Sequence, residues 1–160
     1  MEAFVKTMGK RIGPKSGTDK MFVIDGEPDA MAAQYGEYFN YFILQAYSSS
    51  GNSDLNSRFT AQATHFQQYL TPEQVANKLI VCENFENYAG KGGVTFRLDN
   101  GKTLPSLLGM AYWNPVYNGV TYRKGGVGTY HMEYEYTVSG QTGNYPFLRK
   151  AIQIMNPSIQ

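Results

Sequence analysis

The alternation of apolar and polar residues from Thr129 to Val138 constrains this chain more than any other feature. Tyr130, Met132, Tyr134, Tyr136 and Val138 are the apolar set, and Thr129, His131, Glu133, Glu135 and Thr137 are the intervening polar set. A period of two is typical of a strand with one face on a core and one face in solvent. We therefore predict a strand over residues 129–138, in a sheet with one wet face.

The first half of the chain has helical spacing instead. A turn ending at Pro28 predicts a first helix that continues to about Ala46. A second helix is expected after the polar run 48–53, capped by Ser53 or Asp54. The sequence Thr71-Pro72-Glu73-Gln74 predicts a capping box that opens a third helix. That helix is expected to run through Cys82 to Phe85 and to end at the glycines of 90–93.

Short β-prone runs separated by turn residues fill the second half. They lie at 94–98, 107–113, 116–123, 129–138 and 147–154, with turns at 99–102, 114–115, 125–126 and 140–144, and residues 21–24 add a possible short strand. This order predicts an α+β fold with N-terminal helices packed on a curved antiparallel sheet. We expect a basic flexible arm over 1–20 and a single domain over 21–160.

Charge and cysteine content exclude several classes of protein. A net charge of +1 on 160 residues argues against a nucleic-acid-binding module, although five cations gather in the first twenty residues. That arm is expected to be a solvated tail, with contact to anionic lipid or to nucleic acid as the alternatives. The lone Cys82 excludes an internal disulfide. No run of about 20 apolar residues is present, so the chain as given is expected to be soluble, with a removed membrane anchor as the alternative.

No set of residues predicts catalysis, a metal site or a cofactor. The two histidines, His65 and His131, are too few for a histidine metal site. His131, Glu133 and Glu135 are expected on one strand face, where they would be a solvated polar surface rather than a base beside a carboxylate. The glycines at 125–128 are expected to form a hairpin loop rather than a phosphate cradle, because a strand follows them.

The aromatic content is high, with 13 tyrosines. Tyrosine combines a large apolar body with a hydroxyl that tolerates water, which suits protein contact surfaces and the rims of ligand clefts. We predict a protein-interaction surface, with ordinary core packing as the alternative. Its candidate residues are Tyr38, Tyr41, Tyr112, Trp113, Tyr117, Tyr122 and Arg123.

The order of elements resembles the cystatin-like, nuclear-transport-factor-two-like cone fold. Within it, residues 38–42, 66–73 and 130–136 resemble the TraE and DotI/IcmL inner-membrane assembly subunits of conjugation and type IV secretion systems. This resemblance implies a non-enzymatic scaffold, periplasmic and associated with the inner membrane. It would associate with itself and with other envelope-complex proteins, and would bind no specific nucleic acid.

Two alternatives to the scaffold remain open. One is a small cone-fold enzyme or ligand-binding protein, which would be cytoplasmic. Its pocket would be lined by Tyr and Met, with His131 or Glu133 as base. The other is a virion or pilus-like structural protein.

Overall fold

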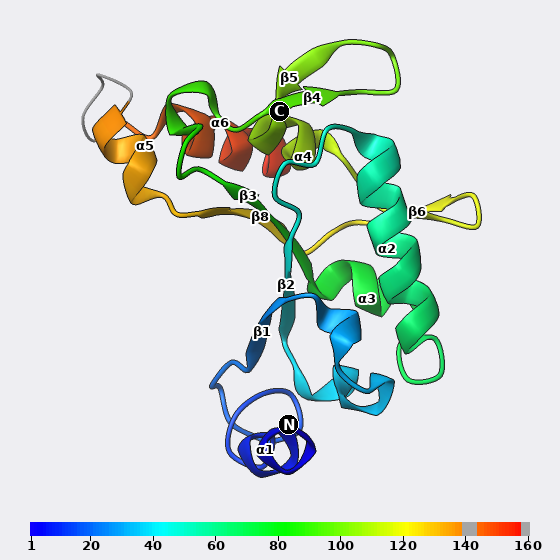
Figure 1. The fold of residues 1–160 in the computed structure, drawn as a ribbon. Helices are drawn as coiled ribbons and strands as arrows, with labels where there is room; N and C mark the ends of the chain where they lie inside the picture. Colours follow the sequence, from blue (N-terminus) through cyan, green and yellow to red (C-terminus); the bar gives the residue numbers. More distant parts are fainter. Residues whose placement is uncertain (139–143, 158–160) are drawn as a thin grey trace. The chain divides into compact units, whose positions relative to one another are not determined.

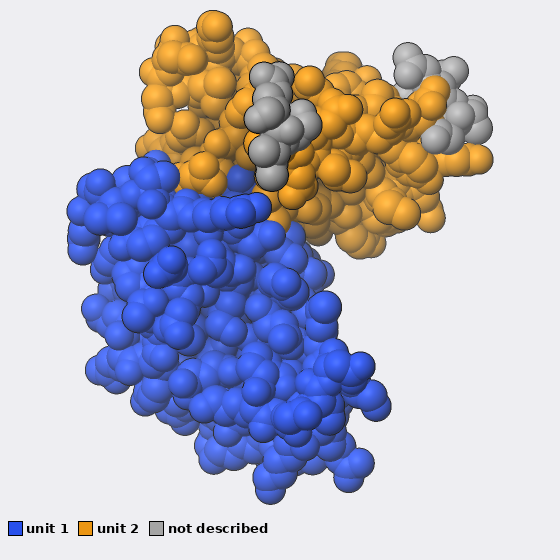
Figure 2. Space-filling view, turned by 180° about the vertical axis from the view of Figure 1, so that it is seen from behind, with its two compact units in different colours: residues 1–45, 56–80, 115–125 blue, residues 46–55, 81–114, 126–160 orange. Residues whose placement is uncertain are grey.

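The computed structural model describes residues 1–138 and 144–157, and it contains helices and strands mixed along the chain (Figure 1). Two compact units share these elements, and each is described here by itself (Figure 2). Unit 1 comprises residues 1–45, 56–80 and 115–125, and unit 2 comprises residues 46–55, 81–114 and 126–160. Helix α2 and strand β3 contribute residues to both.

Unit 1 is built on a parallel strand pair. Its elements are α1 (Glu2–Met8), β1 (Val23–Gly26), η1 (Pro28–Ala30), η2 (Ala33–Tyr38), β2 (Tyr41–Gln45), most of α2 (Asn52–Phe66), α3 (Pro72–Lys78), β6 (Val116–Tyr117) and β7 (Val120–Thr121). Strands β1 and β2 pair in parallel, with Val23 opposite Tyr41 and Gly26 opposite Leu44. Parallel neighbours need a long connection between them, which η1 and η2 supply here.

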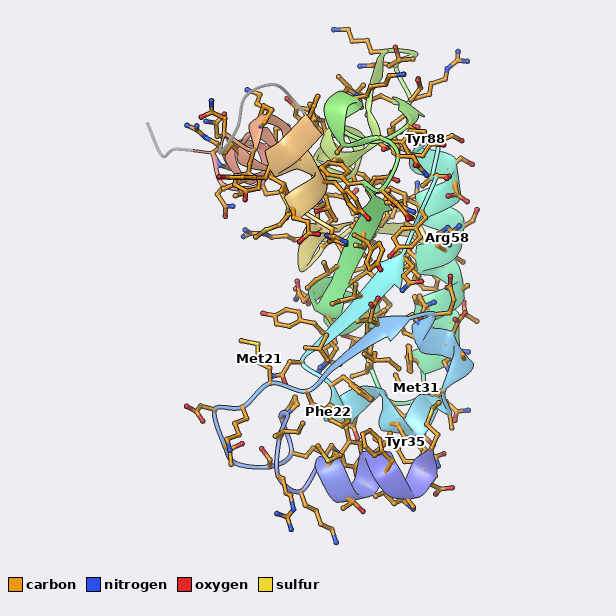
Figure 3. The ribbon with its side chains drawn as sticks, turned by 60° about the vertical axis from the view of Figure 1, so that its left-hand side comes forward. Met21, Phe22, Met31, Tyr35, Arg58 and Tyr88 are labelled. Atoms are coloured by element: carbon orange, nitrogen blue, oxygen red, sulfur yellow. The ribbon has the colours of Figure 1, made fainter. Side chains whose placement is uncertain are left out.

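Aromatic rings fill the core of unit 1. Phe22 and Phe39 lie 4.4 Å apart between ring centroids, and Phe42 stacks on Phe66 at 5.1 Å. Met21 is 64% exposed whereas its neighbour Phe22 is 7% exposed, which fits the alternation expected where the chain enters a strand (Figure 3). Tyr35, on η2, is also buried. These rings hold the short η1 and η2 turns against β2 and α2.

Unit 2 is a smaller set of strands and helices around a second apolar core. Its elements are β3 (Leu79–Asn84, shared), η3 (Ala89–Lys91), β4 (Thr95–Arg97), β5 (Thr103–Pro105), α4 (Ser106–Tyr112), β8 (Gly126–Tyr130), α5 (Glu133–Val138) and α6 (Pro146–Met155). The core comprises Phe85, Ala89, Leu107, Ala111 and Ala151. Helices α4 and α6 pack on each other and cover it.

Several predicted elements are confirmed. The second helix is α2, and the capping box is present at α3: Gln74 N donates to Thr71 Oγ1 at 3.2 Å and Thr71 N donates to Gln74 Oε1 at 2.8 Å. The turn at 99–102 joins β4 to β5, an antiparallel pair. Cys82 is buried as expected. The mixture of helices and strands is therefore correct at the coarse level.

The predicted strand over 129–138 is wrong beyond its first residues. Strand β8 ends at Tyr130, and Glu133–Val138 form helix α5. Residues four apart in an alternating run also lie on one face of a helix, so a short alternation fits both structures. The turn expected at 140–144 falls almost entirely outside the described residues.

Four other predicted segments are wrong in type. Residues 41–45, expected in the first helix, form strand β2, and residues 79–84, expected in the third helix, form strand β3. Conversely, the runs at 107–113 and 147–154, expected as strands, lie in helices α4 and α6. The predicted antiparallel meander is replaced by the parallel pair β1–β2, by β8, and by two short antiparallel pairs, β4–β5 and β6–β7.

The arm expected over 1–20 includes helix α1, and Lys15 Nζ contacts Glu37 Oε2 at 2.7 Å. Lys15 Nζ also lies 5.5 Å from the centroid of the Tyr38 ring, within the range of a cation–π contact. The division into an arm and one domain over 21–160 stays a prediction.

Candidate functional site

Ligand-binding side chains of parallel sheets gather on the connections that follow the carboxyl ends of the strands. In unit 1 this position holds Asp25 and Gln45, whose Nε2 donates to Asp25 Oδ1 at 3.3 Å. In unit 2 the corresponding segments begin after β2 with Ala46 and Tyr47, after β3 with Phe85, and after β8 with His131. Most of the segments that follow the strand ends therefore belong to unit 2.

Four aromatic side chains of these segments form a continuous series, which we call the aromatic cluster: Tyr47, Tyr130, His131 and Tyr134. Ring centroids of Tyr47 and Tyr130 lie 6.3 Å apart, those of Tyr130 and His131 5.0 Å apart, and those of His131 and Tyr134 4.3 Å apart. Tyr134 packs on the apolar core of unit 2, whereas Tyr130 is 51% exposed. Tyr134, at one end of the cluster, is therefore fixed by packing, whereas Tyr130, inside the series, faces solvent.

A carboxylate accompanies the cluster. His131 Nδ1 lies 3.5 Å from Glu133 Oε1, and the two side chains are 36% and 77% exposed. This is an ion pair when the imidazole is protonated. The expected polar face thus holds for Glu133 but not for Glu135, which is fully buried.

Glu135 has a structural partner in helix α6. Its Oε1 accepts from Phe147 N at 2.5 Å and its Oε2 accepts from Leu148 N at 3.3 Å. These amides lie in the first turn of α6, where no intrahelical acceptor is available. Burial raises the pKa of Glu135, and the two amide donors act in the opposite direction.

A second buried carboxyl lies at the end of β3. Glu83 is fully buried, and its Oε1 accepts from Asn84 N at 2.8 Å and from Ser48 N at 3.4 Å. Ser48 directly follows Tyr47 and has a φ of 61°. Glu83 therefore links the end of β3 to the turn that carries Tyr47. Burial raises the pKa of Glu83, with the Ser106 hydroxyl and the two amides opposing it.

Close backbone packing encloses this carboxyl. Gly93 has a φ of +102°, and a Cβ at this position would lie 1.9 Å from Ser106 Oγ and 2.9 Å from Glu83 Cγ. Only glycine fits here without displacing one of these side chains. Ser106 is itself fully buried at the start of α4.

The predicted interaction residues are divided between the two units. Tyr38, Tyr41, Tyr117, Tyr122 and Arg123 belong to unit 1, and Tyr112 and Trp113 belong to unit 2. Within unit 1, the rings of Tyr117 and Tyr122 lie 6.4 and 6.3 Å from that of Phe59. Within unit 2, Trp113 is 3% exposed while Tyr112 is 54% exposed. Their role as a protein-interaction surface stays a prediction.

The sequence-based prediction missed Tyr47, Tyr130 and Tyr134 as site residues. Tyr47 comes directly after the β-prone run 41–45, and a residue that follows a strand is a candidate for a site. The predicted first helix includes that run, so this signal is lost. Tyr134 was assigned to the buried face of a strand. His131, Glu133 and Glu135 were expected on one strand face as a solvated polar surface, and the structure brings His131 and Glu133 into contact after the end of β8.

Across residues 1–138 and 144–157, no group of three His, Cys, Asp or Glu side chains is arranged to hold a metal ion. Within the same ranges, no helix has the length and apolar character needed to cross a membrane.

Comparison with known proteins decides which family the chain belongs to. The model of glycoside hydrolase family 18, BT1044-like, matches residues 1–154. The chain belongs to this family. A curated relative is endo-beta-N-acetylglucosaminidase F2 of Elizabethkingia meningoseptica, which is 28% identical over 163 residues. The match covers 97% of this chain and 45% of that protein.

Two solved structures are similar to this chain in fold. A selenomethionine form of BT1044 with a Glu-to-Gln substitution superimposes with a TM-score of 0.75 at 27% identity, over 98% of this chain and 44% of that one. An endo-beta-N-acetylglucosaminidase from Cordyceps militaris gives a TM-score of 0.65 at 22% identity, over 96% and 49% of the two chains. The chain thus spans about half the length of these relatives.

These matches correct the functional predictions. The resemblance to TraE and DotI/IcmL subunits is wrong, and so are the non-enzymatic secretion scaffold and its envelope-complex partners. The resemblance rested on short aromatic motifs and an element order, and that order itself was partly wrong. The parallel pair β1–β2 and the structures that superimpose on this chain give no support to a cystatin-like cone. The periplasmic location stays a prediction.

Proposed function

We propose that this chain forms part of a glycoside hydrolase that acts on glycans with an internal β-linked N-acetylglucosamine. The observation that carries the proposal is the family 18 match over residues 1–154, and the name of the curated relative supports the choice of linkage. Family 18 enzymes use the substrate itself in catalysis, so they depart from the usual scheme of two protein carboxylates. The orientation of the bound sugar matters for such a reaction, because a group of the sugar, and not of the protein, takes part in it.

The aromatic cluster is the proposed sugar-holding surface of this chain. Pyranose rings present C–H groups on their faces, and these pack on aromatic rings, while tyrosine hydroxyls bond to sugar hydroxyls. Tyr130 is 51% exposed and therefore accessible to a ligand. His131 and Glu133 add a donor and an acceptor beside it. In this proposal the chain binds and orients the glycan.

Binding and hydrolysis test the proposal separately. The probe is a glycan with a chitobiose core, labelled at its reducing end, and the readouts are fluorescence polarisation for binding and mass spectrometry for cleavage. We expect wild-type protein to bind the glycan and Tyr130→Ala to weaken binding by about tenfold, from loss of one stacking contact. Tyr130→Phe keeps the ring and should bind within about threefold of wild type.

Tyr69→Ala is the matched control, because Tyr69 is 41% exposed and lies in unit 1. It should bind like wild type. A wild-type chain that neither binds nor cleaves the glycan, or equal binding by wild type and Tyr130→Ala, would contradict the proposed site.

A further inference from the structure

The chain contains two Asn-Gly dipeptides, and both lie in exposed turns. Asn118-Gly119 joins β6 to β7 in unit 1, and Asn100-Gly101 lies between β4 and β5 in unit 2 (Figure 1). Asparagine is thermolabile because its side-chain amide can be lost, and a following glycine, which has no Cβ, lets the reacting atoms approach. The two dipeptides are alike in sequence, so a difference in their reactivity has to come from the structure.

Loss of the amide needs only the dipeptide and water. The glycine nitrogen attacks Cγ of the asparagine and forms a C–N bond, and the side-chain nitrogen leaves as ammonia with the proton that the glycine nitrogen gives up. The product is a cyclic succinimide. Water then opens the ring. Cleavage of the ring bond to Cγ gives aspartate, and cleavage of the ring bond to the main-chain carbonyl carbon gives isoaspartate, in which the backbone runs through Cγ.

Hydrogen bonds oppose this reaction at Asn100. Gly101 N, which would be the attacking atom, donates to Leu98 O at 2.9 Å. Asn100 Oδ1 accepts from Lys102 N at 3.0 Å, which holds the side-chain amide in place. Both bonds have to break before the two reacting groups can meet, and each broken bond raises the barrier.

No such bonds restrain Asn118. Within residues 1–138 and 144–157, neither its side-chain amide nor Gly119 N forms a hydrogen bond. Both residues are exposed, and no atom lies within 4 Å of a Cβ added to Gly119. The reacting groups can therefore change conformation without losing a contact of their own.

The hairpin that carries Asn118 is also the shorter and more exposed of the two. The β6–β7 ladder has two residue pairs, Val116 with Thr121 and Tyr117 with Val120, whereas the β4–β5 ladder has three. Phe96 of β4 is fully buried, whereas β6 and β7 contain no buried residue. Short ladders with little buried surface open locally at a low cost in free energy.

We propose that Asn118 is a site of spontaneous deamidation in the folded protein and that isoaspartate forms there. Both central residues of the turn have positive φ, 50° at Asn118 and 76° at Gly119, as expected for a two-residue hairpin loop. Isoaspartate lengthens the backbone of this loop by one atom. The pairing of Tyr117 with Val120 depends on the loop, as does the ring contact between Tyr117 and Phe59, so both are expected to loosen in the modified chain.

Ageing of the protein at pH 8.5, folded in buffer and unfolded in guanidinium chloride, tests the proposal. Peptide mapping by mass spectrometry measures the rate of amide loss at each asparagine. An isoaspartate carboxyl methyltransferase with a labelled methyl donor measures isoaspartate. Folding should slow the loss at Asn100 about tenfold more than the loss at Asn118, because two hydrogen bonds of ordinary strength protect Asn100. Equal slowing at both sites, greater slowing at Asn118, or folded protein that accepts no methyl groups would overturn the proposal.

Asn118→Gly and Asn100→Gly identify the source of the isoaspartate. Gly-Gly also suits a loop with two positive φ values, and it has no amide to lose. Aged, folded Asn118→Gly should accept about tenfold fewer methyl groups than wild type, and Asn100→Gly should stay within about twofold of wild type. The reverse order, or equal values in the two variants, would place the modification elsewhere. None of these readouts involves a glycan, so they are independent of the proposed function.

Discussion

At the residue scale, a single glycine next to a buried carboxyl makes the sharpest stability prediction. Gly93→Ala would place a methyl group 1.9 Å from Ser106 Oγ at a φ of +102°. Backbone strain and overpacking each cost about 1–3 kcal/mol, so we expect the free energy of unfolding to fall by about 3 kcal/mol or more. Urea denaturation followed by circular dichroism measures the change.

Gly101→Ala is the matched control, because Gly101 also has a positive φ of +81° but has no atom within 4 Å of an added Cβ. It should lose only the backbone contribution, about 1 kcal/mol. Equal losses in the two variants would show that packing around Gly93 is looser than described.

The buried Glu83 carboxyl predicts a dependence of stability on pH. Its pKa lies above the ordinary value of 4.5, so the folded chain holds this proton more tightly than the unfolded chain. The contribution of Glu83 to stability is therefore greatest below pH 4.5 and decreases as the pH rises through the folded pKa. Glu83→Gln removes this titration while keeping an oxygen that accepts from Asn84 N and Ser48 N.

We expect the free energy of unfolding of Glu83→Gln, relative to wild type, to rise between pH 4.5 and pH 7.5, measured by urea denaturation at both values. Glu73→Gln, on an exposed position of α3, provides the comparison for loss of one carboxylate. A difference that stays constant across this range would contradict a raised pKa for Glu83.

Residue patterns anticipated part of the site. His131 and Glu133 were expected on one polar face together with Glu135, and His131 and Glu133 are in contact in the structure. Glu83 was not recognised, because a lone Glu in an apolar run gives no signal of the amides that will face it. Those amides belong to Asn84 and Ser48, and Ser48 lies 35 residues away in the sequence.

At the element scale, helix α6 depends on a carboxylate from another helix. Tyr145, which precedes α6, makes no side-chain capping bond, and Glu135 accepts from two amides of the first turn instead. We expect Glu135→Ala to destabilise the chain by about 3 kcal/mol, because two partly buried amide donors lose their acceptor. Hydrogen exchange of the α6 amides should accelerate.

Glu133→Ala is the matched control for this prediction, since Glu133 lies in the same helix and its side chain is 77% exposed. It should change the free energy of unfolding by less than about 0.5 kcal/mol. Unchanged exchange in α6 for Glu135→Ala would show that the carboxylate does not hold the helix.

The elements that the sequence misassigned share a physical cause. Residues 41–45 and 79–84 are short apolar runs, and periodicity alone does not separate a buried strand from a buried helix at that length. Helix α6 offered a better signal that was overlooked: Phe147, Leu148, Ala151, Ile154 and Met155 have helical spacing and pack on one core. The capping box at Thr71 was predicted correctly because all its parts are local.

At the scale of the whole molecule, function was beyond the reach of sequence motifs. The residues of the aromatic cluster lie after different strands, at positions 47 and 130–134, so no short motif contains them. The family was identified instead by a match that extends over residues 1–154. The high aromatic content of the sequence does not separate a protein-binding surface from a sugar-binding one, because both favour the same side chains.

Whole-chain charge makes a prediction about solubility. The formal net charge is +1 at pH 7 and the isoelectric point is about 7.8, so electrostatic repulsion between molecules is weakest just above neutral pH. We expect a solubility minimum near pH 7.8, with higher solubility at pH 6 and at pH 9.5. Precipitation with polyethylene glycol across this range measures it, and a solubility that does not vary with pH would contradict the prediction.

The aromatic cluster draws Tyr47 from one interstrand connection and Tyr130, His131 and Tyr134 from another segment of the chain. Side chains on connections can change while the strands that support them stay the same. Exchange of the segment after β2 for that of a relative would therefore replace Tyr47 and leave the other three members of the cluster intact. If the cluster holds a sugar as proposed, such chimaeras would change its selectivity on an unaltered framework.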